Sequence, residues 1–390
     1  MDTPQYSTLL EALQDVPDPR KARGKRYQWH LLLTIIVAAL ASNYQSARAI
    51  AQWARLQADA LRSALSDLTR IPSESTVLRV LRQIDSQVLE QKVAQFVASL
   101  PTTQPYAGCI ITQEGEILQG QALDGKAVRT ATAHGDRTHL VSAVQHASAQ
   151  TLSQTERAQK RSEASAAQHL FQQRDLSGTV TSMDAGLTQR PLAQQIRRQH
   201  GHYLMVVKKN HPQLYAELAL FFEQPGIQAD AEQYDRCRTV SKGHGRLETR
   251  TLECLSASCV DWDWPDAAQI VRRTCERLEC KSGKRTVKVS YAITSLSWQE
   301  ARAVDLERLW RGHWTIEKGK HYVRDVTIGE DRHQMHTGEA PQVLAALRNA
   351  LIDLWRSQGW SNIADALRDT AASVRRALTL IGALPTATLT

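Results

Sequence analysis

The spacing of apolar residues changes along the chain, and this change constrains its fold more than any other feature. Up to about residue 100, apolar residues recur every three or four positions, which is the period of helices packed by one face. From about residue 105, short runs with a period of two alternate with helical patterns, and residues 212–295 are mostly of the alternating kind. Helical spacing then returns. The pattern predicts a mixed α/β (α+β) protein with an N-terminal helical domain and a β-rich insertion.

The chain is moderately basic. Its 390 residues include 48 Lys and Arg against 40 Asp and Glu, which gives a formal net charge of +8. This balance favours a polyanionic partner such as a nucleic acid, although many basic proteins bind none. The apolar run at residues 31–41 is far shorter than the ~20 residues of a membrane span, so we expect a buried helix and a cytoplasmic protein.

Four segments follow from the changes of period. Residues 1–105 are predicted to be a helical domain that binds DNA through a helix carrying Arg79 and Arg82; a packing or dimerisation bundle explains the same pattern equally well. Residues 106–211 are predicted to form the first part of an α/β core, and residues 212–297 the β-rich insertion. Residues 298–390 are predicted to complete the core with C-terminal helices.

Three acidic residues stand where metal-dependent chemistry could be built. Asp124 and Asp184 each follow a strand-like run, and Glu317 lies in a helical stretch. Carboxylates from two strand ends and a helix can hold two Mg²⁺ ions, which drive attack on a phosphodiester. Singly, the aspartates are unremarkable, because Asp-Gly is a common turn and Asp often caps a helix. The dipeptide Asp124-Gly125 therefore predicts that the chain turns there.

Glu317 has the more specific surroundings. On an α-helix, Trp310, His313 and Arg324 share its face, and His321 joins them. An aromatic and basic face around a carboxylate suits metal binding beside a phosphate backbone. Two other interpretations stay open: an exposed, ion-paired helix, or a zinc site made of His313, Glu317 and His321. Apolar residues on the adjacent faces predict that this helix packs against the sheet.

In their order, these blocks resemble the bacterial DDE insertion-sequence transposases, in the branch that includes the H-repeat-associated proteins. The similarity runs over almost the whole chain. The blocks that carry it are Asp18-Pro19-Arg20 with Gly24 and Tyr27, Ser75-Thr76 with Arg79, Asp124-Gly125-Lys126, Asp184-Ala185 with Gln189, His244-Gly245-Arg246 with Glu248 and Arg250, Arg311-x-His313-Trp314-x-Ile316-Glu317, and Glu330-Asp331.

The resemblance implies a ribonuclease-H-like mixed sheet with flanking helices and a β-rich insertion before the glutamate helix. It implies that Asp124, Asp184 and Glu317 are the catalytic residues and the ligands of Mg²⁺, for which Mn²⁺ substitutes. The implied activity is cleavage of DNA at the ends of an insertion sequence and transfer of the 3′-hydroxyl ends into target DNA. Since two ends must be held together, a homodimer on double-stranded DNA, associated with the nucleoid, is expected.

Aromatic and basic residues near these blocks are the predicted DNA contacts. The pattern around the glutamate is carried over from the resemblance, and the other cations suit phosphate contacts. Ordinary surface solvation explains each single cation equally well. The predicted set is Lys126, Lys208, Lys209, Arg246, Arg250, Trp310, Arg311, His313, Lys318, His321 and Arg324.

Five positions depart from the pattern of that branch. Lys318 stands where Asn is usual, Lys320 where Leu is usual and Tyr322 where Trp is usual; Arg161 and Ser162 stand where Ser and Asn are usual. The lysines add positive charge beside Glu317, and together with Ser162 they motivate a second hypothesis, a domesticated or inactive relative that binds DNA ends without cutting. A stand-alone DNA nuclease that cuts but never joins is a third.

Overall fold

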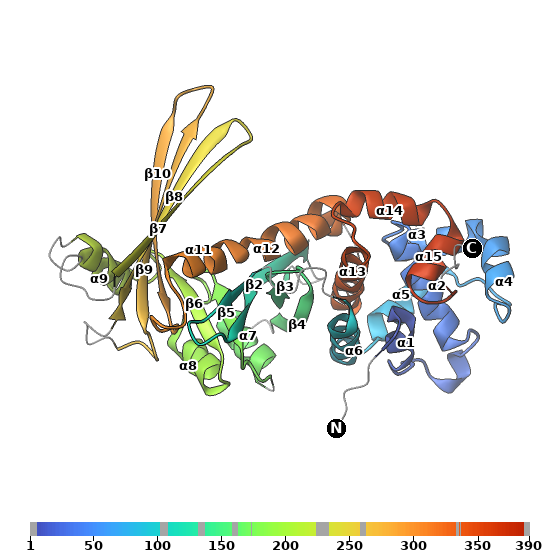
Figure 1. The fold of residues 1–390 in the computed structure, drawn as a ribbon. Coiled ribbons are helices and arrows are strands. Elements are labelled where there is room, and N and C mark those ends of the chain that lie inside the picture. Colours follow the sequence, from blue (N-terminus) through green and yellow to red (C-terminus); the bar gives the residue numbers. More distant parts are fainter. Residues whose placement is uncertain are drawn as a thin grey trace.

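The computed structural model describes residues 6–101, 108–131, 137–157, 163–172, 174–223, 234–257, 263–332, 335 and 337–385. Three regions follow one another in Figure 1: a helical part that contains the first and last helices, a central sheet flanked by helices, and two long β-hairpins that project from the far side. The predicted α/β class with an N-terminal helical region is confirmed.

The helical part is built from both ends of the chain. Its members are α1 (Leu9–Gln14), α2 (Trp29–Ala41), α3 (Ala47–Leu56), α4 (Ala58–Ala64), α5 (Glu74–Gln83), α6 (Ser86–Ser99), α13 (Ala340–Ser357), α14 (Ile363–Ala371) and α15 (Val374–Leu380). Their apolar side chains share one continuous core. Helix α13 packs against α6 and also against strand β4, so it joins this part to the sheet.

Helix α2 is buried on all sides. Every residue from Leu31 to Ala41 is buried, which confirms the buried helix predicted for this apolar run. In the described part of the chain, no helix has the length and apolar character needed to cross a membrane. Helix α5 begins at a side-chain cap, because the Ser73 hydroxyl accepts a hydrogen bond from the backbone N–H of Thr76 at 3.4 Å.

Five strands in the order β4-β3-β2-β5-β6 form one half of the sheet, with β4 at its edge. Strand β2 pairs antiparallel with β3, and β3 with β4, whereas β2, β5 and β6 run parallel. An antiparallel meander followed by two parallel strands is the ribonuclease-H-like arrangement, which confirms that prediction. The strands are β2 (Ile117–Ala131), β3 (Arg137–Gln145), β4 (Thr151–Arg157), β5 (Thr179–Met183) and β6 (His202–Val207), with β1 (Cys109–Ile111) paired to β2.

The β-rich insertion is confirmed, and its strands extend the same sheet. They are β7 (Tyr234–Gly243), β8 (Arg246–Ser256), β9 (Gln269–Glu279) and β10 (Arg285–Thr294), and helix α9 (Pro212–Glu223) precedes them. Strand β10 pairs with β6, and the order then runs β10-β9-β8-β7. The outer halves of these strands are the projecting hairpins of Figure 1.

Helices cover both faces of the central sheet. One face packs against α7 (Glu163–Phe171) and α8 (Arg190–Arg198), and the other against α11 (Ala303–Gly312). Side chains alternate along a strand, so Ala122, which packs on Ile316, and Asp124 point to the same face. On β5, Val180 packs with residues of α11. Asp184 is an even number of positions further along, so its side chain points to the same face. Both aspartates therefore face the segment that carries Glu317.

Two local predictions were wrong. Asp124 and Gly125 do not form a turn, because they lie within β2 opposite Ser142 and Val141 of β3, and this pairing overrides the turn preference of Asp-Gly. The helix around Glu317 is not one regular α-helix. After α11 come a short α12 (Trp314–Ile316) and two π-helical segments, η3 (Glu317–His321) and η4 (Val323–Thr327).

Candidate catalytic site

Asp124 lies in a strongly charged, half-buried position on β2. Its Oδ1 accepts a hydrogen bond from the backbone N–H of Gly125 at 2.9 Å, and its Oδ2 is 3.5 Å from Nδ1 of His321. Burial raises the pKa of Asp124 to about 7, assisted by the negative charges of Glu317, Asp184 and Glu163. Only the Gly125 hydrogen bond opposes the shift. The carboxylates are thus close enough to raise the cost of ionising Asp124.

Asp184 follows the end of β5 and is paired with a lysine. The Lys208 ammonium group, just beyond the end of β6, lies 2.6 Å from Oδ1 and 2.7 Å from Oδ2 of Asp184. Burial by itself would raise the pKa of Asp184, but the hydrogen bond and charge of Lys208, together with the Ala185 backbone N–H, lower it. Asp184 therefore stays ionised beside the less acidic Asp124.

Glu317 is exposed at the first residue of the η3 segment. The packing of Ile316 on Ala122 fixes this segment over β2, and the charge of Glu317 acts directly on Asp124. The three acids predicted from the sequence therefore come together at one end of the parallel strands, although they are 193 positions apart along the chain (317 − 124).

The chemistry of this donor set fits a hard divalent cation, because carboxylate oxygens are the ligands that Mg²⁺ and Mn²⁺ prefer. The pKa of Asp124 is raised mainly by burial, and the negative charges of Glu317 and Asp184 add to the shift, so these carboxylates lie within electrostatic range of one another. Within the described ranges, no three His, Cys, Asp or Glu side chains are already arranged to hold a metal ion. In this arrangement Lys208 lies against the Asp184 carboxylate and His321 against the Asp124 carboxylate.

A buried chain of polar groups lies behind the acids. His146 Nε2 is 2.9 Å from the Ser182 hydroxyl, which lies 3.2 Å from Nδ1 of His313. Burial lowers the pKa of His146 to about 3, so its imidazole is neutral. A Cβ atom at either Gly120 or Gly312 would lie 2.2 Å from His146 Nδ1. The imidazole therefore fits between β2 and the end of α11 only because both positions are glycine.

Several predicted DNA contacts are held inside the protein. Trp310 is buried under the Arg273 guanidinium, and His313 is buried against Ser182. The Arg324 side chain is 1% exposed and pairs with Glu330. A DNA contact by these three residues stays a prediction, since in this structure their side chains face the protein interior. For Arg324, the π-helical turns between it and Glu317 hold more residues than α-helical turns, which changes the face of the helix that it occupies. Lys126 is likewise buried, in an ion pair with Asp325.

Other predicted contacts are accessible to different degrees. Lys209, Arg311 and Lys318 are exposed, and the Lys208 side chain is half exposed beside Asp184. His321 is partly buried on Asp124. In the hairpins, Arg246 is partly exposed. Arg250 forms an ion pair with Glu248 and donates a hydrogen bond to the Ser241 hydroxyl.

Two exposed aromatic residues next to Glu317 were not predicted as contacts. Trp314 is 50% exposed and Tyr322 is 59% exposed, and the Lys318 ammonium lies 5.7 Å from the centre of the Trp314 ring. With Arg311 they form an aromatic and basic surface, which we call the Trp314 surface (Arg311, Trp314, Lys318 and Tyr322). The four-residue spacing of Trp314, Lys318 and Tyr322 was the available signal.

The unusual Lys320 does not add charge to the acidic site. It is buried and forms an ion pair with Asp353 of α13. Arg161 and Ser162, which also depart from the pattern, lie outside the described residues.

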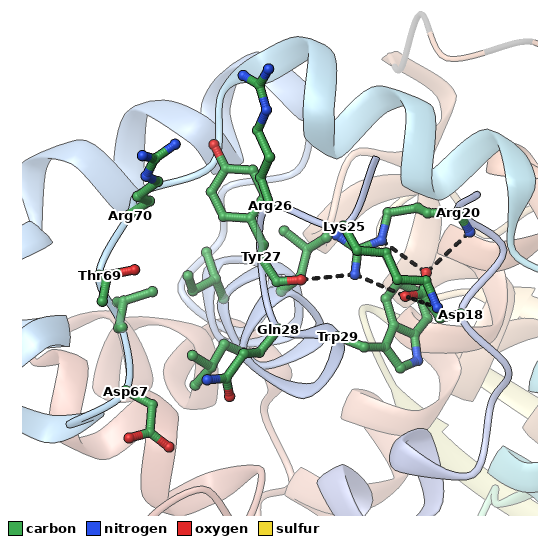
Figure 2. Close-up of a pocket in the computed structure, with 14 residues that line it drawn as sticks. Asp18, Arg20, Lys25, Arg26, Tyr27, Gln28, Trp29, Asp67, Thr69 and Arg70 are labelled. Atoms are coloured by element: carbon green, nitrogen blue, oxygen red, sulfur yellow. Dashed lines mark hydrogen bonds and ion pairs between the residues drawn. The ribbon is translucent and has the colours of Figure 1, made fainter. Parts of the chain in front are cut away.

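The N-terminal block of the sequence resemblance forms the wall of a separate cavity of about 430 Å³. Arg20 Nε and Nη2 donate to the two oxygens of Asp18 at 2.8 and 2.9 Å, and Nη2 also donates to the Tyr27 carbonyl at 2.9 Å (Figure 2). Exposed Arg26 and Arg70 lie at the rim. Arg20 thus fixes the loop that shapes this cavity.

Comparisons with known proteins match two parts of this chain to transposase families. Residues 117–354 match the family described as Transposase DDE domain, and residues 10–97 match the family described as DDE_Tnp_1-associated. The first match covers more than half of the chain and all three acids. The chain belongs to the DDE transposase family.

Relatives of this transposase family member include a protein named "Putative transposase YncI" from Escherichia coli O157:H7, 24% identical over 90% of this chain and 87% of that protein. Another is "H repeat-associated putative transposase YhhI" from Escherichia coli K12, 22% identical over 90% of each chain. The predicted resemblance to the H-repeat-associated branch is therefore confirmed. A piggyBac transposase in a synaptic complex with hairpin DNA matches 97% of this chain and 78% of that chain, with a TM-score of 0.41 and 10% identity.

Proposed function

We propose that this chain is the transposase of a bacterial insertion sequence, which cuts DNA at the ends of its element and joins the exposed 3′-hydroxyl ends to target DNA. The observation that carries the proposal is the meeting of Asp124, Asp184 and Glu317 on one side of the ribonuclease-H-like sheet, within a chain of the DDE transposase family. Asp124, Asp184 and Glu317 are proposed to hold Mg²⁺, or Mn²⁺ in its place.

When bound, the metal would supply activation of the attacking oxygen and stabilisation of the leaving oxygen of the phosphodiester. The protein side chains have the tasks of binding and orientation. Glu317 is exposed, so DNA can approach it along the Trp314 surface. Exposed Lys209 and Arg311 suit contacts to DNA phosphates. A homodimer on DNA follows from the need to hold two ends.

Lys208 is proposed to exchange its contact with Asp184 for a contact with DNA. Its ammonium group neutralises Asp184 in the present arrangement. Since the same side chain is half exposed, it can turn toward a DNA phosphate when Asp184 binds a cation.

The test uses labelled duplexes that carry the inverted repeats flanking this gene, incubated with Mg²⁺. The wild-type protein is expected to cut at the repeat boundary and expose a 3′-hydroxyl. Asp184→Asn keeps the size of the side chain but removes its charge, and is expected to lose at least about 10²-fold in rate, as for removal of a major electrostatic catalytic group. Asp59→Asn, at a fully exposed carboxylate of α4, is the matched control and should cut normally.

The same pairing of Asp184 with Lys208 favours a second candidate, a DNA-end-binding protein that does not cut. That function predicts specific binding to the repeats by wild type and Asp184→Asn alike, with no cleavage by either in Mg²⁺ or Mn²⁺. Cleavage without covalent donor–target products would instead identify a stand-alone nuclease.

A further inference from the structure

One part of the wall of the cavity in the helical part is apolar and aromatic. Tyr27 and Trp29 line the cavity, and both are partly buried. The aliphatic side chains beside them are buried and comprise Leu31, Leu32, Ile35 and Leu68. The volume of about 430 Å³ falls in the range of ~300–1,000 Å³ that is usual for small-molecule sites. This part of the cavity suits a flat, largely apolar ring.

The remaining wall carries positive charge. Arg26 and Arg70 are exposed, and Figure 2 shows both guanidinium groups on the same side of the cavity. Neither forms an ion pair within the described part of the chain. Of the acids in the wall, Asp18 is neutralised by Arg20, with the Lys25 ammonium also 3.5 Å away, and Asp67 is exposed. The charged part of the wall therefore suits an anion.

Helix α2 begins at this wall, and its N-terminus is open. The Gln28 side chain at the N-cap makes no capping hydrogen bond, and the first turn contains no acidic residue. Backbone N–H groups at such a helix end attract phosphate, because their dipoles add to a partial positive charge.

Arg20 indicates a ligand independently of the helix. Its side chain lines the cavity and is only 6% exposed. Asp18 and the Tyr27 carbonyl accept from Nε and Nη2, but Nη1 is buried and has no hydrogen-bond partner among the described residues. A buried donor without a partner costs about 1–3 kcal/mol. Fixing the loop accounts for two of the three nitrogens, and the third remains for an acceptor that enters the cavity.

We propose that this cavity binds one unpaired nucleotide of a DNA strand. Its phosphate lies against Arg26, Arg70 and the N-terminus of α2, and its base enters the cavity beside Tyr27 and Trp29. A base inside a duplex is stacked and paired, so it reaches a recessed apolar wall only from a single-stranded end or after leaving the helix. The choice of DNA as the source of the nucleotide rests on the proposed function, since the same chemistry would also accept a free nucleotide.

The test is photocrosslinking of the full-length protein to a short oligothymidine that contains one 5-iodouracil base, with mass spectrometry of the crosslinked peptide. The expected crosslink lies at Tyr27 or Trp29, because these are the aromatic side chains of the cavity. Unlabelled oligothymidine should compete, whereas an abasic strand with the same phosphates should compete at least about tenfold less well, since stacking of a base contributes about 1–3 kcal/mol. Equal competition by the abasic strand would overturn the base site. Competition by thymidine 5′-monophosphate at the same nucleotide concentration would overturn DNA as the occupant.

A variant with fewer cations tests the phosphate contacts. Arg26→Gln/Arg70→Gln removes two exposed charges and leaves the Arg20–Asp18 pair intact, so its thermal stability should match wild type. Its affinity for the oligothymidine should fall about tenfold or more, as for loss of a hydrogen bond to a charged group. The slope of log affinity against log salt should decrease by about 1.4, at ~0.7 for each phosphate contact to a single strand.

The control is Arg55→Gln/Arg62→Gln, which removes the same charge from exposed positions of α3 and α4 outside the cavity and should bind like wild type. Equal losses in both double variants would overturn a specific site. Cleavage of element ends by the wild-type protein, without a crosslink at Tyr27 or Trp29, overturns this inference and leaves the proposed function intact. A crosslink there, without any cleavage in Mg²⁺ or Mn²⁺, supports the nucleotide site and overturns the proposed function instead.

Discussion

The Lys320 ammonium group and the Asp353 carboxylate form an ion pair in the protein interior, between the helical segment that carries Glu317 and helix α13. Lys320 is 2% exposed and Asp353 is 0% exposed. The second oxygen of Asp353 accepts a hydrogen bond from the backbone N–H of Thr151 on β4, at 3.1 Å. One buried carboxylate thus contacts the segment that carries Glu317 and the sheet from helix α13 of the helical part.

Replacing only one partner of this pair should be costly. Lys320→Leu restores the residue that is usual in related sequences but leaves the Asp353 carboxylate buried without its counter-ion. We expect the free energy of unfolding to fall by about 3–5 kcal/mol in urea titrations. The double variant Lys320→Leu/Asp353→Asn removes both charges, keeps an acceptor for Thr151, and should recover most of the loss. Equal stability of Lys320→Leu and wild type would contradict the ion pair.

Stability should depend on acid pH through Glu330. Burial by itself would raise its pKa, but Arg324 and Arg348 outweigh burial and lower it from 4.5 to about 2. As the pH falls, the Glu330 carboxyl group is protonated in the unfolded chain before it is protonated in the folded protein. The stabilisation is therefore complete above pH 4.5 and is lost as the pH falls toward 2. It amounts to about 3 kcal/mol at 1.36 kcal/mol for each pKa unit.

Glu330→Gln isolates this contribution. The difference in unfolding free energy between wild type and the variant should be constant from pH 7 to about 5 and shrink at lower pH. The measurement is a set of urea titrations between pH 7 and 3. A difference that stays constant down to pH 3 would show that the arginine pair does not hold Glu330 ionised.

Gly312→Ala should be destabilising, although alanine normally stabilises a helix relative to glycine by roughly 0.5–1 kcal/mol. The new methyl group would lie 2.2 Å from the buried His146 ring. We expect a loss of about 1–3 kcal/mol from overpacking, measured by urea unfolding, and slower cleavage because α11 leads into the Glu317 segment. The second change His146→Ala should relieve the clash, so that the double variant is more stable than the two single effects predict. If the losses of unfolding free energy in the two single variants simply added up in the double variant, this would argue against a contact between position 312 and the His146 ring.

The Trp314 surface should bind DNA. Trp314→Ala and Tyr322→Ala should each weaken binding to the element ends by about 1–3 kcal/mol if the ring stacks on an unpaired base. Since both rings are at least half exposed, thermal stability should change little. Fluorescence anisotropy with labelled ends provides the affinity, and Leu56→Ala, at an exposed apolar residue of α3, is the control. Unchanged affinity in both aromatic variants would exclude this surface from the interface.

The sequence was a good guide to the architecture and to the positions of the three acids. The changes in apolar period located the helical region, the mixed sheet and the insertion. The blocks around Asp124, Asp184 and Glu317 pointed to residues that the fold brings together. Their convergence could not be derived from spacing, because it depends on the parallel pairing of β2 with β5 and on the packing of Ile316 against β2.

The details that failed are those set by tertiary structure. The Asp-Gly turn was overridden by pairing with β3, and the helical face around Glu317 was misjudged because the segment is π-helical. Arg324 was predicted as a DNA contact from the family pattern around Glu317, whereas in the structure it forms an ion pair with buried Glu330.

The central claim is that Asp124, Asp184 and Glu317 form the metal centre of a transposase. Crystals of the protein bound to a DNA end and soaked in Mn²⁺ test it most directly, through the anomalous scattering of manganese. The account predicts anomalous peaks within ligand distance of these three carboxylates, with the Lys208 ammonium group moved away from Asp184. Well-ordered DNA and side chains with no anomalous peak there, and the Lys208–Asp184 pair intact, would contradict it.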